Sequence, residues 1–445
     1  MDISDIGKFS WEIGEFFNAI SKFSISKFQN NIMDILRFIT AGSVDDGKST
    51  LIGRLLYDSK NILIDQLEQL EKQSKNKEAG EIDLAYLTDG LRAEREQGIT
   101  IDVAYRYFST PKRKFIIADA PGHVQYTRNM ITGASNANLI IILIDARQGV
   151  VEQTRRHSII ASLLNIPHVV VAINKMDLVN YSRDVFNNIV IDYAEVVKSL
   201  GLQDVRYIPV SALQGDNIVD KSEKMNWYES ESLLHFLENV EIQQDINLTD
   251  ARFSVQYVIR PQTEELHDYR GYAGKIISGV YKKHDRVVIL PSRVSSTIKS
   301  VEVGGEQVNE AFAPQSVVIQ LEDDIDIGRG DMIVKENDLP EINNEFGALL
   351  CWMDNKPLVA GNKYYLQLNS RLVRSIVREV EYKLNVNTLE KEYDPTSVGL
   401  NDIVKVTIKT ASEVAFDPYK KLQSNGGAIL IDETSNVTVG ACMIQ

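Results

Sequence analysis

The chain has 445 residues, which is too long for one ordinary hydrophobic core and predicts two or three domains. Hydrophobic residues make up 44% of it and charged residues 25%, values that exclude an intrinsically disordered chain. The formal charge of −14 argues against binding to nucleic acid or to a membrane surface. Because Cys351 and Cys442 cannot form a disulfide framework and residues 1–30 lack the apolar core of a secretory signal, we expect a cytoplasmic protein.

The N-terminal extension, residues 1–33, carries one apolar stripe at alternating spacings of three and four residues, which predicts an amphipathic helix. The stripe consists of Ile6, Phe9, Ile13, Phe16, Ile20 and Phe23. We expect this helix to pack on the domain that follows it. Docking to a partner subunit and association with a membrane surface are the alternatives, and the polar face is not markedly basic, as a membrane-surface helix would require.

Residues 34–245 alternate short apolar strands with helix-like segments, a pattern typical of a doubly wound α/β domain with a mostly parallel sheet. The apolar runs 139–144 and 169–173 are too short to span a bilayer and predict buried parallel strands. The polar stretch 241–250 predicts a linker to the next domain.

The first strand of this domain leads into a phosphate-binding loop. After the apolar run 35–39, the pattern G-x-x-x-x-G-K-S runs into a helix-like segment, and this context distinguishes such a loop from a chance match. Lys48 is predicted to reach the β/γ-phosphate oxygens as a catalytic residue, and Ser49 to ligate Mg²⁺. The predicted nucleotide-binding residues of the loop are Gly42, Ser43, Val44, Asp45, Asp46, Gly47, Lys48, Ser49 and Thr50.

Two further segments predict a switch that responds to the γ-phosphate. Asp119 follows an apolar run and is predicted to hold Mg²⁺, while the N–H of Gly122 senses the γ-phosphate. Thr100, in a Gly-Ile-Thr-Ile segment, is predicted to close on Mg²⁺ when triphosphate is bound, and His123 to position the attacking water. Thr100 and His123 are thus catalytic candidates, and the nucleotide-binding residues here are Asp119, Ala120, Pro121, Gly122 and His123.

An Asn-Lys-x-Asp motif after the apolar run 169–173 predicts which nucleotide base the site binds. The Asp177 carboxylate can accept hydrogen bonds from N1–H and the 2-amino group of guanine, whereas adenine would leave it unpaired. The alternative is a purely structural role, in which Asp177 only caps a helix. The predicted base-binding residues are Asn174, Lys175, Met176 and Asp177, with Ser211, Ala212 and Leu213 supporting the base edge. We therefore expect GTP and Mg²⁺ as ligands.

After residue 251 the sequence changes to short β-like runs separated by Gly, Asp and Pro turns. The expected fold is an α/β P-loop GTPase domain followed by two small all-β barrels, with an acidic, proline-containing break at 335–344 between the barrels. The expected domains are residues 1–33, 34–245, 251–336 and 344–445.

These residues resemble the translation-factor class of GTPases, through Asp119 to His123, the following Asn-Met-Ile-Thr-Gly, the Gly-Ile-Thr-Ile loop and the two trailing β-domains. Within that class the chain is more specifically similar to the large, GTP-binding subunit of bacterial heteromeric sulfate adenylyltransferase (ATP sulfurylase). The segments that carry this resemblance are 42–56, 93–108, 270–274 and 435–441, and the similarity covers roughly residues 36–442.

The resemblance implies that GTP hydrolysis is coupled to formation of adenylyl sulfate and pyrophosphate from ATP and sulfate. It also implies a smaller partner subunit that carries the adenylylation site, in agreement with the lack of a second phosphate loop, since Gly274-Lys275 has neither the upstream glycine nor the following Ser or Thr. The alternatives are a translational GTPase that delivers a charged tRNA and a regulatory GTP-binding scaffold. The charge of −14 does not suggest an RNA carrier.

Overall fold

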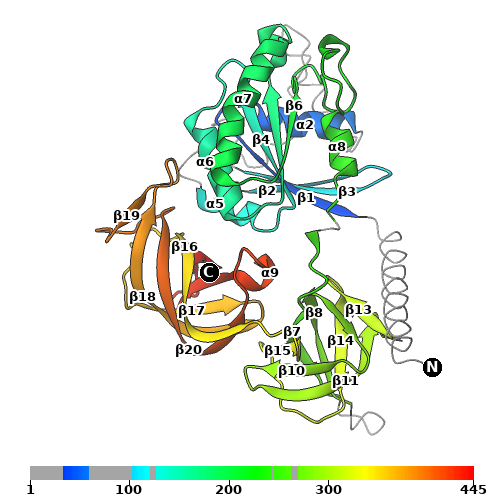
Figure 1. Ribbon diagram of the computed structural model, residues 1–445, viewed down its shortest axis with the longest axis vertical. Helices are drawn as coiled ribbons and strands as arrows, with labels where there is room; N and C mark the ends of the chain where they lie inside the picture. The colour runs from blue at the N-terminus through cyan, green and yellow to red at the C-terminus, as the bar shows by residue number, and fades with distance from the viewer. Residues whose placement is uncertain (1–33, 60–102, 121–126, 243–244, 262–268) are drawn as a thin grey trace, which may run out of the picture.

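The computed structural model describes residues 34–59, 103–120, 127–242, 245–261 and 269–445. They form an α/β domain followed by two β-barrels, which lie below it in the view of Figure 1. The helix predicted for residues 1–33 lies outside the described residues.

The α/β domain is built on a six-stranded sheet with the order β2-β3-β1-β4-β5-β6. All neighbouring strands are parallel except the edge strand β2, which is antiparallel to β3. The strands are β1 (Ile35–Ala41), β2 (Ala104–Ser109), β3 (Lys114–Asp119), β4 (Leu139–Asp145), β5 (His168–Asn174) and β6 (Asp204–Pro209). The strands expected at 139–144 and 169–173 are confirmed as β4 and β5, whose apolar side chains are buried between two helical layers.

Helices cover both faces of this sheet and bury its apolar side chains. One face packs against α2 (Lys48–Asp58) and α8 (Leu233–Asn239), and the other against α5 (Thr127–Ala134), α6 (Glu152–Leu163) and α7 (Arg183–Leu200). Helix α7 begins after Ser182, whose side chain accepts from the Val185 N–H, and ends at Gly201 in a left-handed conformation. None of the helices in the described ranges is long and apolar enough to cross a membrane.

The first barrel closes through the pairing of β10 with β11, and β12 extends beyond the closed ring. Its strands are β7 (Arg252–Ile259), β8 (Gly271–Ser278), β9 (Val280–Lys282), β10 (Arg286–Leu290), β11 (Val294–Val303), β12 (Glu306–Val308), β13 (Glu310–Phe312), β14 (Ser316–Leu321) and β15 (Met332–Lys335). The short strands β9 and β13 pair with each other beside the ring.

The second barrel closes through β17 and β18, and β19 extends beyond it. It contains β16 (Glu341–Trp352), β17 (Lys363–Leu368), β18 (Arg371–Leu384), β19 (Lys391–Tyr393), β20 (Ile403–Phe416), α9 (Gln423–Gly426), β21 (Gly427–Asp432) and β22 (Thr438–Ile444). The break predicted at 335–344 was too long. Glu341 to Asn343 already belong to β16, because they pair with Val414 to Phe416 of β20.

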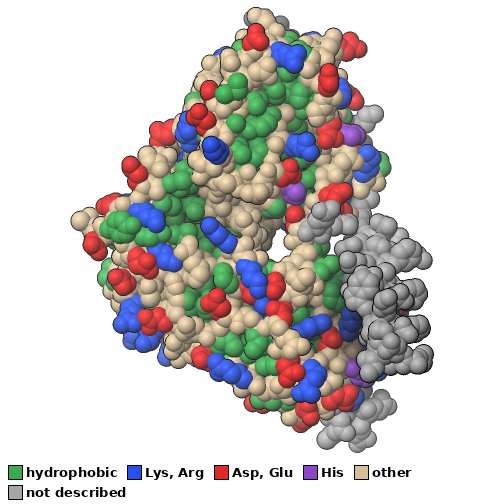
Figure 2. All heavy atoms as spheres, in the orientation of Figure 1, with side chains coloured by type: hydrophobic (Ala, Val, Ile, Leu, Met, Phe, Trp, Pro, Cys, Tyr) green, Lys and Arg blue, Asp and Glu red, His purple; other side chains and the backbone are tan. Residues whose placement is uncertain are grey.

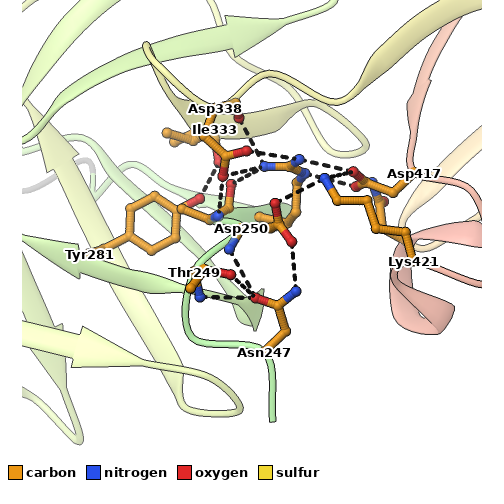
Figure 3. A network of polar contacts seen from close by, with 11 residues as sticks. Asn247, Thr249, Asp250, Tyr281, Ile333, Asp338, Asp417 and Lys421 are labelled. Atoms are coloured by element: carbon orange, nitrogen blue, oxygen red, sulfur yellow. Dashed lines mark hydrogen bonds and ion pairs between the residues drawn. The ribbon is translucent and has the colours of Figure 1, made fainter. Parts of the chain in front are cut away.

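A charged network around the buried side chains of Arg252 and Asp417 joins the two barrels. Arg252 of β7 is fully buried and forms two hydrogen bonds to the Asp417 carboxylate, from Nε at 2.8 Å and from Nη2 at 2.9 Å. Its Nη1 also lies 3.0 Å from Oδ2 of Asp338, and Lys421 lies 2.9 Å from Asp250 (Figure 3). The network thus connects the start of the first barrel, the segment between the barrels and the end of β20.

The second barrel also contacts the α/β domain, mainly through apolar side chains. Cys351, Leu384 and Ile403 belong to the same buried cluster as residues of α5, α6 and α7. Tyr419 and Gln423 add hydrogen bonds to backbone carbonyl groups that follow α6. In the space-filling view an opening remains between the three parts of the molecule, and acidic and basic side chains are interspersed over the visible face (Figure 2).

Candidate nucleotide-binding site

The predicted site residues that the structure describes lie along one edge of the sheet, at the carboxyl ends of parallel strands. The register places Thr40 of β1 opposite Asp119 of β3, and Asp145 of β4 opposite Asn174 of β5. Open α/β sheets bind their ligands outside this edge. The strands thereby bring together motifs that are far apart in the sequence.

The loop between β1 and α2 has the shape expected of a phosphate-binding loop. Gly47 has a φ of 91°, and a Cβ there would lie 2.5 Å from Nδ2 of Asn174, so a larger residue would be both strained and too close. Lys48 Nζ donates to the carbonyl oxygens of Gly42 at 2.9 Å and Ser43 at 2.8 Å. Helix α2 begins at Lys48, so its unpaired N–H groups and positive dipole end lie at the loop.

The Lys48 ammonium group is the positive charge at the centre of this loop. Burial lowers its pKa, and the nearby carboxylates of Asp119, Asp46 and Asp45 act in the opposite direction. A cation that has lost its water gains more from phosphate oxygens than an exposed one, because the local dielectric is low. This arrangement suits a polyphosphate ligand.

The side chain of Asp46 is directed into the loop, which the sequence did not predict. It is 2% exposed, and its Oδ2 accepts a hydrogen bond from the Ser43 N–H at 2.5 Å. Burial raises the pKa of Asp46, while the Ser43 N–H and Lys48 act to lower it. The carboxylate therefore braces the loop from within, and phosphate contacts of this residue would come from its backbone.

The residues predicted to hold Mg²⁺ offer suitable ligand atoms. Asp119, at the end of β3, is buried and accepts a hydrogen bond from Thr40 Oγ1 at 3.2 Å, and Ser49 is the second residue of α2. A carboxylate and a hydroxyl are oxygen ligands of the kind that Mg²⁺ prefers. Four predicted switch residues lie outside the described ranges, namely Thr100, Pro121, Gly122 and His123.

Asn174 links the phosphate loop to the loop after β6. Its Nδ2 donates to the Asp46 carbonyl oxygen at 2.7 Å, and its Oδ1 accepts from the Ala212 N–H at 2.9 Å. Since the side chain is 1% exposed, both bonds are shielded from water. Asn174 therefore sets the spacing between the phosphate end and the base end of the site.

The Asp177 carboxylate is oriented by the loop after β6. Ser211 Oγ donates to Asp177 Oδ1 at 2.6 Å, and Met176 beside it is fully buried in the core. Leu213, on the same loop as Ser211, leaves 45% of its surface exposed although its side chain is large and apolar. This combination of an oriented acceptor and an exposed apolar side chain suits a flat purine base with donors on its edge.

The structure adds Asp145 to the site, a residue that the sequence analysis missed. Its carboxylate lies 3.0 Å from Lys175 Nζ and 2.6 Å from Arg147 Nη2. Burial raises its pKa, but the hydrogen bonds from Arg147 and Lys175 outweigh this and hold the pKa of Asp145 at about 2. Asp145 ends a buried apolar strand just as Asp119 does, so the same positional rule would have found it.

Fold and site together define a P-loop GTPase of the translation-factor class. The family described as "Elongation factor Tu GTP binding domain" matches residues 33–255, and "GTP-eEF1A C-terminal domain-like" matches residues 345–445. Among solved structures, the GTP-bound Ski7 GTPase-like domain of S. cerevisiae covers 95% of this chain and 99% of its own, at 16% identity and a TM-score of 0.50. That likeness supports the fold.

Relatives above 50% identity narrow the class to one family. "Sulfate adenylyltransferase subunit 1" of Bacteroides fragilis is 54% identical over 413 residues, which is 92% of this chain and 86% of the relative. The same-named protein of Alteromonas mediterranea is 52% identical over 94% of this chain and 88% of its own. "Bifunctional enzyme CysN/CysC" of Mycobacterium tuberculosis is 52% identical over 92% of this chain and 67% of its own length. The chain belongs to the sulfate adenylyltransferase subunit 1 family.

Proposed function

We propose that this chain is the GTPase subunit of a sulfate adenylyltransferase. In this role it couples GTP hydrolysis to the formation of adenylyl sulfate and pyrophosphate from ATP and sulfate, in sulfate assimilation in the cytoplasm. A phosphosulfate anhydride is uphill to form, so a second, favourable hydrolysis must be linked to the reaction. The observation that carries the proposal is the orientation of Asp177 by Ser211 in a chain that is 54% identical to a named subunit 1.

The chain's own residues account for nucleotide binding and hydrolysis. Lys48 and the N–H groups of the loop bind the phosphates, and Asp177 accepts hydrogen bonds from guanine. Ser49, Asp119 and Thr100 would hold Mg²⁺, which neutralises phosphate charge when bound. His123, directly after the Asp-x-x-Gly segment, would orient the attacking water.

The adenylylation chemistry belongs, in this proposal, to a smaller catalytic subunit in a hetero-oligomer. The name "subunit 1" of the relatives indicates a complex with another subunit. The Gly274-Lys275 pair does not form a second phosphate loop, because Gly274 lies in β8, where a Cβ would come within 2.2 Å of the Ser254 carbonyl oxygen. Its glycine serves close strand packing in the first barrel.

One substitution tests the base contact directly. Asp177→Asn replaces an acceptor by a side-chain amide, which pairs with the 2-oxo group of xanthine better than with the 2-amino group of guanine. We expect GTP affinity to fall by roughly ten- to a hundredfold, with a gain for xanthosine triphosphate. Equilibrium binding of fluorescent GTP and XTP analogues measures both. An unchanged preference for GTP would show that Asp177 does not read the base.

The coupling is tested with the partner subunit. GTP hydrolysis by the purified chain is measured alone and with the small subunit of the same species, with and without ATP and sulfate. We expect hydrolysis to rise only when the partner and both substrates are present, and adenylyl sulfate formation to depend on GTP. Stimulation by ribosomes or aminoacyl-tRNA, without any response to ATP and sulfate, would overturn the proposal in favour of a translational GTPase.

A further inference from the structure

Arg54 connects the phosphate helix to the base end of the site. It lies on α2, the helix that begins at Lys48, and its guanidinium group reaches across to the loop after β6. Its Nε donates to the Ala212 carbonyl oxygen at 3.2 Å, and its Nη2 donates to the Leu213 carbonyl oxygen. Only 19% of the side chain is exposed, so these charge-assisted bonds are partly shielded from water.

The loop that Arg54 holds is the loop that orients Asp177. Ser211 Oγ donates to Asp177 Oδ1 at 2.6 Å, and the Ser211 carbonyl oxygen accepts from the Gly215 N–H at 2.8 Å, which closes a tight turn. Gly215 has a φ of 82°, and a Cβ there would lie 3.6 Å from Cδ of Arg54. The turn therefore lies directly against the stem of the arginine.

We infer that Arg54 is a positioning residue for base recognition, which holds residues 211–213 against the phosphate helix so that Ser211 and Asp177 face guanine together. The inference deepens the proposed function and depends on the assignment of Asp177 to the base. Arg54 thereby connects helix α2, which follows the phosphate-binding loop, to the loop that orients Asp177 at the base.

The residue type matters for this role. A guanidinium group is planar and donates in fixed directions, so one side chain can bond two successive carbonyl oxygens. A lysine ammonium keeps the charge and the apolar stem but lacks this fork. Asp58, one turn along α2, lies 3.5 Å from Nη1 and adds a second, weaker support for the guanidinium group.

The test compares GTP with ITP, which lacks the 2-amino group and so gives up one hydrogen bond to Asp177. In Arg54→Ala we expect GTP affinity to fall by about tenfold and ITP affinity by less than about threefold, so that the preference for guanine shrinks. Arg54→Lys should give an intermediate loss with the same trend. Arg183→Ala, at an exposed position of α7, is the matched control and should change neither affinity.

Affinities are measured by titration with fluorescent nucleotide analogues, and circular dichroism confirms that each variant is folded. Equal losses of GTP and ITP affinity, or no loss, in Arg54→Lys would overturn the inference, because a purely structural role in α2 affects both nucleotides alike. Asp177→Asn is measured in parallel. If that variant keeps its preference for GTP, the assignment of Asp177 to the base is wrong, and the inference about Arg54 is wrong with it. If that variant loses the preference, the base assignment is supported, and the Arg54 variants alone decide whether Arg54 is a positioning residue.

Discussion

The second barrel contacts two neighbours, and the two contacts differ in kind. The contact with the GTPase domain contains a shared apolar core. Beside this core, the neutral side chains of Tyr419 and Gln423 donate hydrogen bonds to backbone carbonyl oxygens at 3.3 and 2.7 Å. Toward the first barrel the second barrel presents Asp417, which is 2% exposed and paired with the fully buried Arg252 (Figure 3). Both contacts include apolar side chains, but the contact between the barrels also contains a fully buried ion pair.

This difference indicates which of the two contacts of the second barrel separates more easily. A buried charge that loses its partner costs several kcal/mol, whereas neutral groups and apolar surface return to water at a smaller cost per contact. We therefore expect the two barrels to remain together as one unit, and the GTPase domain to separate from the second barrel first. Asp417→Ala and Gln423→Ala test this order of strength.

The largest effect is expected for Asp417→Ala. This change leaves the Arg252 guanidinium group buried with Asp338 as its remaining carboxylate partner, and also removes the acceptor of Asn425. We expect the barrels to lose about 3–5 kcal/mol of unfolding free energy, measured by urea denaturation followed by circular dichroism.

The control lies in the same interface but at its surface. Arg293 and Glu413 form a pair at 2.8 Å in which both side chains are largely exposed. Glu413→Ala should therefore cost less than about 1 kcal/mol. Similar losses in the two variants would contradict the distinction between the buried network and the rim.

A smaller effect is expected at the contact between the second barrel and the GTPase domain. Gln423→Ala removes donors to the carbonyl groups of Leu164 and Asn165 and should cost about 1 kcal/mol, which corresponds to roughly a fivefold rise in the open population. Cys351 reports this opening, because it is fully buried in the shared core and burial raises the pKa of its thiol to about 12.

Labelling with a thiol reagent measures the opening. Cys442 serves as an internal reference, because it lies in the core of the second barrel itself and should react only when that barrel unfolds. We expect Gln423→Ala to accelerate labelling of Cys351 but not of Cys442. Gln203→Ala, which removes a hydrogen bond to the Gly201 carbonyl oxygen within the GTPase domain, is the control. Equal acceleration at both cysteines would mean that the second barrel and its contact with the GTPase domain open together.

The smallest effect is expected at the linker to the first barrel, where a histidine of the GTPase domain contacts Asp245 of the linker. His168 at the start of β5 lies between two carboxylates, with Nδ1 2.7 Å from Asp204 Oδ2 and Nε2 3.1 Å from Asp245 Oδ2. The hydrogen bond to Asp245, together with that to Asp204, raises the pKa of His168 despite its partial burial.

Since the folded-state pKa lies above the unfolded one, this stabilisation is complete below a pH of about 6.5 and is lost as the pH rises through the folded value. As the pH rises from about 6 to about 8.5 we expect a loss of stability that is smaller than the loss in Gln423→Ala and that His168→Gln abolishes. Thermal unfolding at both pH values measures it, with the exposed His235→Gln as control. An unchanged pH dependence in His168→Gln would show that the linker contact does not titrate.

Local sequence patterns determined the class of this protein. The glycine-rich loop, the Asn-Lys-x-Asp motif and the alternating β-like runs of both barrels were predicted because each depends on residues within one short segment. When such a motif directly follows a parallel strand, it lies at the ligand-binding edge of the sheet, and this placement does not depend on distant parts of the chain. The α/β domain with two trailing barrels follows from the same local signals.

Tertiary structure alone decided the roles of Arg54 and Arg252. Arg252 lies in an ordinary strand, and carboxylates 86 and 165 residues away make its burial possible. Arg54 meets its carbonyl partners 158 residues or more along the chain, and the β16 residues 341–343 are strand rather than break because β20 pairs with them. Charge pairing and strand pairing are satisfied between distant segments, so the local sequence carries the groups but not their partners.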